Sequence, residues 1–127
     1  MNPKGVTICL SRYAVKETID RLQSFLQQHG VTIYARIDQQ LELEKTGQTI
    51  DPLEFLLFGN PNAGGPAMIE NPVAALDLPL KIIAWEDNDK KVWVAYNEAG
   101  YIKDRFSLSD SVSAALNLDL VVPKALA

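Results

Sequence analysis

Residues 79–96 have the sequence PLKIIAWEDNDKKVWVAY, in which two apolar segments flank the polar stretch 87–89. Both segments are rich in β-branched and aromatic residues, the composition that favours strands. Asn and Asp tolerate the positive φ of tight turns, so the stretch between the segments predicts a β-hairpin. Because the two strands of a hairpin are antiparallel, the sheet that contains them must be at least partly antiparallel.

The N-terminal part of the chain predicts a strand followed by a helix. Gly5–Leu10 alternates apolar with small or polar residues and predicts the strand. Apolar residues then recur three or four positions apart, the spacing of one helix face, at Val15, Ile19, Leu22 and Leu26. Gly30 is expected to end this helix. Ala14 occupies the expected N-cap position, so Ser11 is the alternative capping residue.

Two further segments predict strands with different surroundings. Val31–Ile37 alternates strictly and predicts a half-buried strand, with odd-numbered residues on one face and even-numbered residues on the other. Pro52 precedes the almost wholly apolar segment 53–58, which predicts a strand covered on both faces or in contact with a second subunit. The charges of this segment and of the hairpin, Glu54 and Lys81, are expected to be neighbours on one sheet face.

The segments between the strands predict short helices and one long turn. Gln39–Lys45 predicts a short helix. The stretch 59–66 is rich in Gly, Pro and Asn and predicts a long turn. Ala67–Leu76 predicts helical turns that are interrupted by Pro72, and Glu98–Phe106 predicts another short helix.

A last helix, capped by Ser109 or Asp110, is expected to run to about Ala125. The residues expected to face inward from it are Val112, Leu116 and Leu120. The element order is therefore β-α-β-(α)-β-(α)-β-β-α-α, in which only the first β-α-β unit could be a parallel crossover. This order predicts an α+β fold, with a single, mainly antiparallel sheet and helices packed on one face. Residues 1–127 are expected to form a single domain.

Composition excludes several classes of protein. The chain has 127 residues, of which 47% are hydrophobic and 22% are charged, with 7 Gly and 7 Pro. These values exclude collagen, a coiled coil and disorder. A formal charge of −4 and scattered basic residues argue against a nucleic-acid partner, which needs a basic stripe. No apolar run approaches about 18 residues and no signal peptide is evident, so we expect a cytoplasmic protein without a membrane partner.

A single cysteine and a single histidine limit the chemistry. Cys9 has no partner for an intramolecular disulfide or a cysteine zinc site, and it fits a reducing compartment. With His29 as its one histidine the chain cannot form a histidine-rich metal site, and in the last turn of the first helix His29 would complement the helix dipole. We therefore expect neither a metal nor a cofactor.

Two kinds of feature are candidates for a site. The glycine-rich stretch that contains Asn60 and Gly64 lacks the motifs of a P-loop or a dinucleotide fold, but its backbone N–H groups could form an anion nest. Asp38 and Glu86 each end a strand, where a sheet edge can present a carboxylate into a cleft. The alternatives are a rigid turn for the first feature and local capping for the second.

Several motifs, in consistent order over about residues 5–108, resemble the family called domain of unknown function 302. They are YARID at 34–38, LLFGNPNAG at 56–64, ALDLPLK at 75–81, AWED at 84–87 and VWVAYN at 92–97. The resemblance implies a compact α+β fold, an antiparallel sheet backed by helices and a tendency to form dimers. It supplies no catalytic mechanism.

The chain departs from the family pattern at one position. In that pattern a His usually follows the strand-end Asp, whereas here Gln39 follows Asp38. A metal or proton-transfer role of that His is therefore not carried over to this chain, while a structural or amide-binding role is compatible with Gln39.

Three functions remain open from the sequence. The first is non-catalytic binding of a small molecule or peptide, and its candidate residues are Asp38, Gln39, Asn60, Gly64 and Glu86. The second is homodimeric assembly through an exposed apolar strand or the C-terminal helix. The alternative is an enzyme in which the carboxylates of Asp38 and Glu86 act as acid and base.

Overall fold

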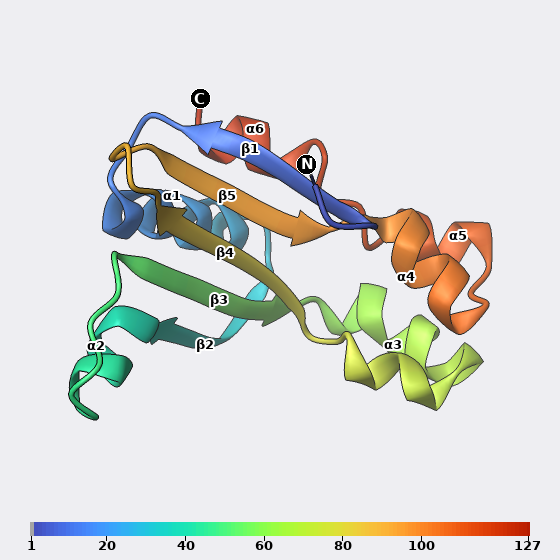
Figure 1. Ribbon diagram of the computed structural model, residues 1–127. Helices are drawn as coiled ribbons and strands as arrows, with labels where there is room; N and C mark the ends of the chain where they lie inside the picture. The colour runs from blue at the N-terminus through green and yellow to red at the C-terminus, as the bar shows by residue number, and fades with distance from the viewer. Residues whose placement is uncertain (1) are drawn as a thin grey trace.

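The computed structural model describes residues 2–127, and its centre is one five-stranded antiparallel sheet with the strand order β1-β5-β4-β3-β2 (Figure 1). The strands are β1 (Val6–Ser11), β2 (Thr32–Asp38), β3 (Leu53–Gly59), β4 (Leu80–Glu86) and β5 (Val92–Asn97). The predicted hairpin joins β4 to β5. β1 and β2 lie at opposite edges of the sheet, so the helix that connects them crosses its whole face.

The helices form two groups. They are α1 (Val15–Gln28), α2 (Gln39–Glu44), α3 (Pro61–Glu70), the 3₁₀ helix η1 (Pro72–Leu76), α4 (Ala99–Phe106), α5 (Asp110–Ala114) and α6 (Val121–Ala125). α1 contacts β2, β3, β4 and α6 on one face of the sheet. α3, η1, α4 and α5 contact one another beyond one end of the sheet (Figure 1). The α+β fold with helices on one sheet face is confirmed.

Each helical group encloses an apolar cluster. The first cluster lies between α1, α6 and the sheet and includes Ile19, Leu22, Leu56 and Ile82, all fully buried. The second lies among α3, η1, α4 and α5, and its buried members are Ala67, Ala74, Ile102, Phe106, Leu108 and Leu116. Leu80 packs against both clusters, so the two apolar regions are continuous.

A β-bulge at Tyr34 divides β2 into two halves that face opposite ways. Ile33 pairs with Phe58, and the next pair along the strand joins Ala35 to Leu57. Tyr34 is therefore the extra residue, and such a bulge reverses the alternation that follows it. The prediction that all odd-numbered residues of this strand share a face is wrong for this reason.

The glycine-rich stretch after β3 is mostly helical, where the sequence predicted a long turn. α3 begins at Pro61 and contains Gly64, Gly65 and Pro66. Gly and Pro are poor helix formers, but Pro is favoured in the first helical turn, and the tertiary contacts of Ala67 hold the rest.

The predicted long C-terminal helix is two short helices. α5 ends at Ala114 and α6 begins at Val121. The prediction that Leu120 faces inward is wrong, because its side chain is 72% exposed. Leu116 and Leu118 lie in the segment between the helices and are buried, so this segment closes the fold without continuous helix.

Two predicted local contacts are replaced by others. Ser11 does not cap α1, because its Oγ lies 2.7 Å from Thr18 Oγ1 and accepts from the Tyr13 N–H. Glu54 and Lys81 are not neighbours on one face, since Glu54 pairs with Ala84 and Lys81 pairs with Leu57. Glu54 faces α1, whereas Lys81 lies on the opposite face of the sheet.

That opposite face is apolar, and most of its side chains are half-buried against one another, with Leu10 exposed. One row in register crosses all five strands: Ile37, Phe55, Ile83, Ala95 and Ile8. The neighbouring row contains Leu53, Trp85, Trp93 and Leu10. No helix of residues 2–127 lies across β1, β5 and β4 on this side (Figure 1). We call these two rows the open sheet face.

Candidate functional site

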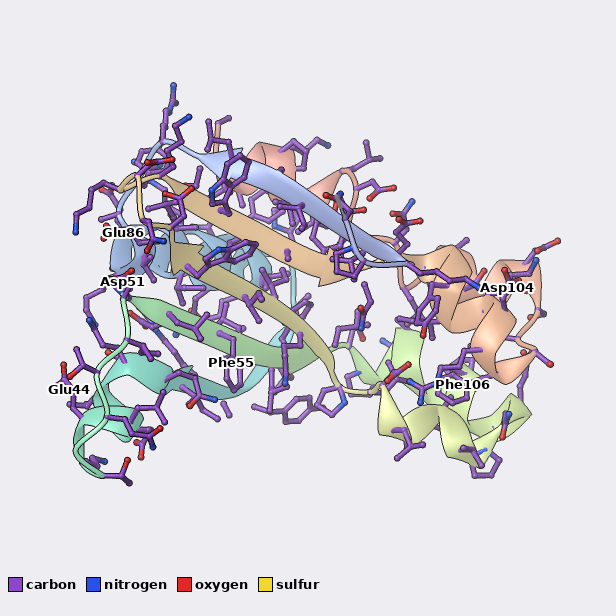
Figure 2. All side chains as sticks on the ribbon, in the orientation of Figure 1. Glu44, Asp51, Phe55, Glu86, Asp104 and Phe106 are labelled. Atoms are coloured by element: carbon purple, nitrogen blue, oxygen red, sulfur yellow. The ribbon has the colours of Figure 1, made fainter. Side chains whose placement is uncertain are left out.

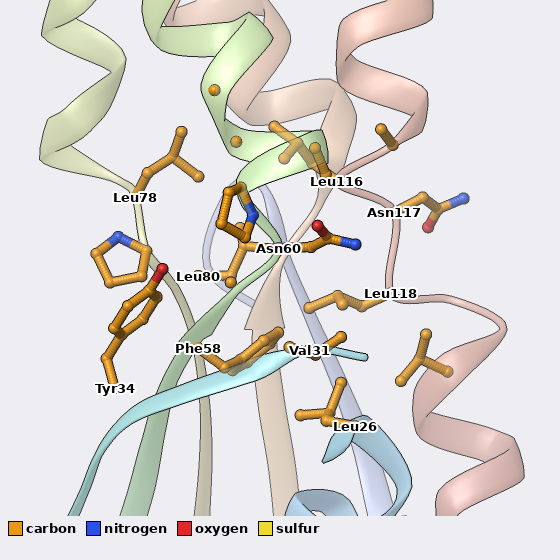
Figure 3. A pocket seen from close by; sticks show the side chains of 18 of the residues that line it. Leu26, Val31, Tyr34, Phe58, Asn60, Leu78, Leu80, Leu116, Asn117 and Leu118 are labelled. Carbon is orange, nitrogen blue, oxygen red and sulfur yellow. The ribbon is translucent and has the colours of Figure 1, made fainter. Parts of the chain in front are cut away.

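A cavity with a volume of about 400 Å³ lies where the two apolar clusters meet (Figure 3). Its walls come from four parts of the chain: the end of β3 with α3, the start of β4, the segment between α5 and α6, and the end of α1 with the start of β2. The apolar residues that line it include Leu26, Val31, Phe58, Met68, Leu78, Leu80, Leu116, Leu118 and Val121. The polar side chains in its lining are those of Tyr34, Asn60 and Asn117.

Asn60 starts the α3 wall and fixes its geometry. It is the N-cap of the helix, and its Oδ1 accepts from the Asn62 N–H at 2.9 Å. Its carbonyl oxygen accepts from the N–H groups of Ala63 and Gly64, at 2.8 and 2.9 Å. Pro61 has no N–H to offer. The first turn of α3 therefore uses its own N–H groups, which argues against the anion nest considered from the sequence.

Gly64 and Gly65 keep the α3 wall open. A Cβ at Gly64 would approach Leu78 Cδ1 at 4.0 Å, and a Cβ at Gly65 would meet nothing within 4 Å. Neither position has the positive φ that would require glycine. Each glycine costs a helix interior about 1 kcal/mol relative to alanine. The two glycines therefore lower the stability of α3, and Gly64 leaves space beside Leu78.

The outer side of α3 is tied to α5. Glu70 accepts from the Ser109 N–H at 2.8 Å and from the Ser109 hydroxyl at 2.7 Å. Both hydrogen bonds lower the pKa of Glu70, and the bond from the backbone N–H has the larger effect. The Asn71 amide donates to the Phe106 carbonyl at 3.0 Å, which joins the end of α3 to α4.

A tyrosine on the sheet fixes the position of the wall formed by the segment between α5 and α6. Tyr96 is buried on β5, and its hydroxyl donates to Asp119 Oδ1 at 2.8 Å. Burial and this hydrogen bond raise the pKa of Tyr96. Asp119 follows Leu118 directly, so the contact positions the buried Leu118 side chain in the cavity wall.

The predicted site residues fall at two opposite ends of the sheet. Asn60 and Gly64 line the cavity. Asp38 and Glu86 lie at the other end, because Asp38 pairs with Glu54 at the start of β3 and the Glu86 N–H donates to the Pro52 carbonyl. Figure 2 shows Glu86 at that end, far from Phe106 in the helical group. The five predicted residues therefore do not share one groove.

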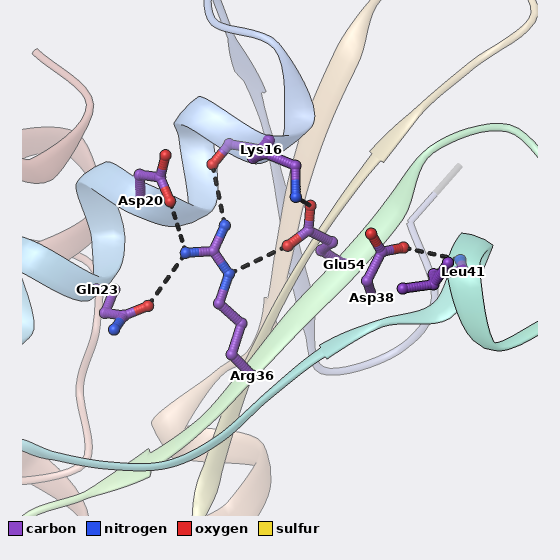
Figure 4. A network of polar contacts seen from close by, with 7 residues as sticks. All are labelled: Lys16, Asp20, Gln23, Arg36, Asp38, Leu41 and Glu54. Carbon is purple, nitrogen blue, oxygen red and sulfur yellow. Dashed lines mark hydrogen bonds and ion pairs between the residues drawn. The ribbon is translucent and has the colours of Figure 1, made fainter.

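Each residue at the far end has a local role. Asp38 is the N-cap of α2, and its Oδ1 accepts from the Leu41 N–H at 3.0 Å (Figure 4). Gln39 is the first residue of that helix. Glu86 forms an ion pair with Lys90 at 3.6 Å. Neither Asp38 nor Glu86 lines the cavity.

A charged network joins α1 to the sheet beside Asp38 (Figure 4). Arg36 Nε donates to Glu54 Oε1 at 3.1 Å, and Arg36 Nη1 donates to Asp20 Oδ1 at 2.6 Å. Lys16 Nζ lies 3.5 Å from Glu54 Oε2. Glu54 is only 4% exposed, and its partners compensate the cost of burying its charge. The bulge at Tyr34 turns Arg36 toward α1 and makes this network possible.

The cysteine and the histidine lie outside the cavity lining. Cys9 is half-buried, and burial raises the pKa of its thiol, which makes it a poor nucleophile at neutral pH. His29 Nδ1 lies 2.8 Å from the Phe25 carbonyl oxygen, and the two rings stack. Among residues 2–127 no group of three or more His, Cys, Asp or Glu side chains is placed to hold a metal ion.

Sequence reasoning missed most of the cavity lining. Leu78 belongs to the ALDLPLK motif, Leu80 to the first strand of the predicted hairpin, and Leu116 to the inward face of the predicted long helix. Only the fold brings these residues to the end of β3. Their signal in the sequence is an ordinary apolar pattern, which core residues share. Tyr34 begins the YARID motif at 34–38, but the alternation of residues 31–37 does not reveal the bulge that places Tyr34 at the cavity.

Comparison with protein families gives one match over most of the chain. The sequence model of the family described as Domain of unknown function DUF302 matches residues 7–120. This range contains β3, α3 and β4, and it includes nearly the whole cavity lining.

Curated relatives include proteins from Brucella. Fluoride-specific ion channel FluC 1 of Brucella suis biovar 1 is 33% identical over 112 residues, which are 88% of this chain and 44% of that protein. Fluoride-specific ion channel FluC 2 of Brucella melitensis biotype 1 is 33% identical over 112 residues, with 42% of its length covered. The chain thus spans less than half the length of these relatives. No helix among residues 2–127 is long and apolar enough to cross a bilayer.

A solved structure has the same fold. The crystal structure of an uncharacterized conserved protein DUF302 from Bacillus stearothermophilus superposes with a TM-score of 0.80 and 17% sequence identity. The superposition covers 98% of this chain and 97% of that one.

Proposed function

The chain belongs to the DUF302 family, and we propose that it is a non-catalytic binding domain for a small, largely apolar molecule. The cavity between its two apolar clusters would hold that molecule. A volume of about 400 Å³ is within the range of about 300–1,000 Å³ typical of small-molecule sites.

One observation carries the proposal. The helix that walls the cavity contains two adjacent glycines whose φ values do not require glycine, and Gly64 faces Leu78 across the open space. Alanine at these positions would favour the helix and fill part of the cavity. An unfilled apolar cavity lowers the stability of the folded protein, because the residues that line it lack van der Waals contacts on one side. A ligand that occupies the cavity supplies these contacts.

The enzyme alternative has weaker support. Asp38 and Glu86 are separated by β3, and their carboxylates are engaged by the Leu41 N–H and by Lys90. Acid–base catalysis needs two such groups directed at one substrate position. The arrangement favours binding over catalysis.

Fluorescence of a neutral naphthalene ketone, 6-propionyl-2-dimethylaminonaphthalene, tests the proposal. Its emission should rise and shift to the blue when the wild-type protein is added. Gly64→Leu, which projects a side chain into the cavity, should abolish the change. Gly100→Leu is the matched control, because Gly100 lies in α4, outside the cavity lining, with nothing within 4 Å of its Cβ position. An unaltered signal with Gly64→Leu would refute the proposal.

The open sheet face favours a second candidate function, homodimeric assembly with a second copy of the chain. Strands about 4.8 Å apart that rise about 3.3 Å per residue give this face a projected area of roughly 500 Å². This area is smaller than the roughly 800 Å² that each partner of a standard interface buries, so the interface would lie at the small end of the size range. Leu10, 58% exposed, and the paired Trp85 and Trp93 would be covered by the partner.

Sedimentation equilibrium tests the assembly. A dimer is expected for the wild type. Ile83→Lys should shift the equilibrium to monomer, because it places a cation at the centre of the open sheet face beside Lys81. Leu76→Lys is the control, since Leu76 is 72% exposed on η1 and lies off the sheet. A wild type that sediments as a monomer at micromolar concentration would exclude this interface.

For the present chain we propose a cytoplasmic location, which fits its single free cysteine.

A further inference from the structure

We infer that the ligand of the cavity is a neutral apolar molecule with one carbonyl-type oxygen, and that the side-chain amide of Asn60 donates to this oxygen. The inference rests on the proposed binding function and adds the chemical class of the ligand. It follows from three features of the cavity: one oriented donor, the charge of the lining, and the direction of α3.

The hydrogen bonds of Asn60 decide which end of its amide is free. The Asn62 N–H is a donor, so the atom that meets it at 2.9 Å must be Oδ1. Nδ2 is then the remaining group, and it makes no hydrogen bond to another of residues 2–127. Figure 3 shows Nδ2 directed toward Leu118, on the C-terminal wall of the cavity. Asn60 therefore presents donors and no free acceptor to a ligand.

The two other polar side chains of the lining are less suited to this role. Tyr34 is 56% exposed, so water competes for its hydroxyl. Asn117 is exposed, and its Oδ1 accepts from the Asp119 N–H at 2.9 Å. Asn60 is half-buried, and a hydrogen bond from it to a ligand would be better shielded from water.

The charge of the lining excludes an ionised ligand. None of the cavity-lining residues among residues 2–127 is Asp, Glu, Lys, Arg or His. A carboxylate or an ammonium group would lose its hydration on entry and would meet no opposite charge. A neutral oxygen loses much less hydration, and one hydrogen bond compensates it.

The direction of α3 favours an acceptor at this position. The helix begins beside Asn60, so its positive dipole end faces the part of the cavity where Nδ2 lies. The N–H groups of Asn62, Ala63 and Gly64 are already bonded. The helix terminus therefore supports the negative end of a carbonyl without offering the several donors that a full anion needs.

Three compounds with one skeleton test the inference: 4-phenylbutan-2-one, 3-phenylpropanoate and n-butylbenzene. Each would be titrated into isotope-labelled protein while the amide signals of Gly64, Gly65 and Leu118 are followed by NMR. In the wild type, the ketone should bind at least about tenfold more tightly than the carboxylate, its equal in size.

Asn60→Asp is the decisive variant. Asp is also a good N-cap, so its Oδ1 can keep the bond to the Asn62 N–H, while the Nδ2 donors are replaced by a second acceptor. The dissociation constant of the ketone should rise about tenfold, the change expected for loss of one buried hydrogen bond. That of n-butylbenzene should stay within about twofold, which also shows that the cavity is intact.

Asn62→Asp is the matched control. It adds the same charge at the start of α3 from a residue outside the cavity lining, and it should leave the affinity for the ketone unchanged. If Asn60→Asp leaves the ketone unaffected, or if the carboxylate binds as tightly as the ketone, the inferred ligand class is wrong and the binding function still stands. If none of the three compounds shifts the cavity amides, both proposals are wrong.

Discussion

Replacement of Gly64 and Gly65 by alanine should stabilise the ligand-free protein. Both residues lie in the interior of the ten-residue helix α3. Gly64→Ala should gain up to about 1 kcal/mol from helix propensity. At Gly65 the gain should be smaller, because the ring of Pro66 crowds a Cβ on the residue that precedes it in a helix. Tertiary steric cost is small, because the new Cβ atoms would lie 4.0 Å from Leu78 Cδ1 or beyond 4 Å from atoms outside the adjoining residues. The double variant should therefore gain about 1–2 kcal/mol, and the midpoint of thermal unfolding should rise by about 4–8 °C.

Urea unfolding followed by far-UV circular dichroism measures the effect, with a constant slope showing that the unfolded state is unchanged. Gly47→Ala is the control with the opposite sign. Gly47 has φ +81° and nothing within 4 Å of its Cβ position, so alanine there adds only backbone strain of about 1–2 kcal/mol. A double variant at 64 and 65 that is no more stable than the wild type would show that the reasoning about α3 is wrong.

The same double variant should lose ligand affinity while it gains stability. The methyl group added at Gly64 narrows the cavity beside Leu78. The thermal shift produced by a saturating neutral ketone should therefore be smaller than in the wild type. Opposite changes in stability and in ligand-induced stabilisation would separate a binding role of the glycines from a purely structural one.

Three further predictions concern the rest of the fold. The pKa of Asp87 is lowered mainly by the hydrogen bond from Trp93 Nε1 and next by the bond from the Lys91 N–H. The ionised carboxylate therefore stabilises the fold above its ordinary pKa of about 3.9, and this stabilisation is lost as the pH falls through the lowered pKa. Asp87→Asn should be less stable than the wild type at pH 6, with a gap in urea midpoint that narrows at pH 2; an equal gap at both pH values contradicts this. Arg36→Met should cost about 3 kcal/mol because it leaves Glu54 buried without its main partner. Lys16→Met should cost less than about 1 kcal/mol because Lys16 is mostly exposed. If urea unfolding showed the same loss of stability for Lys16→Met and Arg36→Met, the roles assigned to the two residues would be wrong. Because Leu80 joins the two clusters, we expect one domain, in which tryptophan fluorescence from the sheet and circular dichroism from the helices give the same unfolding midpoint.

The antiparallel sheet could be predicted because its determinants are local. The Asp87 carboxylate accepts from the N–H groups of Asp89 and Lys91 and forms the turn that the DND stretch indicated. The spacing of Val15, Ile19 and Leu22 is a periodic signal that survives in any context, and all three are buried in α1. Such signals depend on neighbours within about one turn or one hairpin, which the sequence contains in full.

The bulge and the helix after β3 could not be predicted because distant residues decide them. Strict alternation over 31–37 is a correct description of the sequence, but it does not show that Arg36 must turn toward Glu54 and Asp20. An arginine that bonds to buried Glu54 and exposed Asp20 on the helix side compensates the irregular backbone at Tyr34. Local pattern and tertiary charge pairing conflict here, and the charge pairing determines the face.

The same conflict makes the cavity possible. Gly64, Gly65 and Pro66 together cost α3 several kcal/mol of helix propensity, on the order of 5 kcal/mol by standard scales. The contacts that offset this cost lie on the outer side of α3, where Ala67 is fully buried and Glu70 binds Ser109. With the helix held from that side, its inner side is free to remain unfilled. A site of this kind has no motif of reactive side chains, and its signal is a poor helix former in a segment that is nevertheless helical. The ligand contacts should therefore be sought at the N-cap Asn60 and at Gly64, where α3 departs from its local preference, and away from the carboxylates at the opposite end of the sheet.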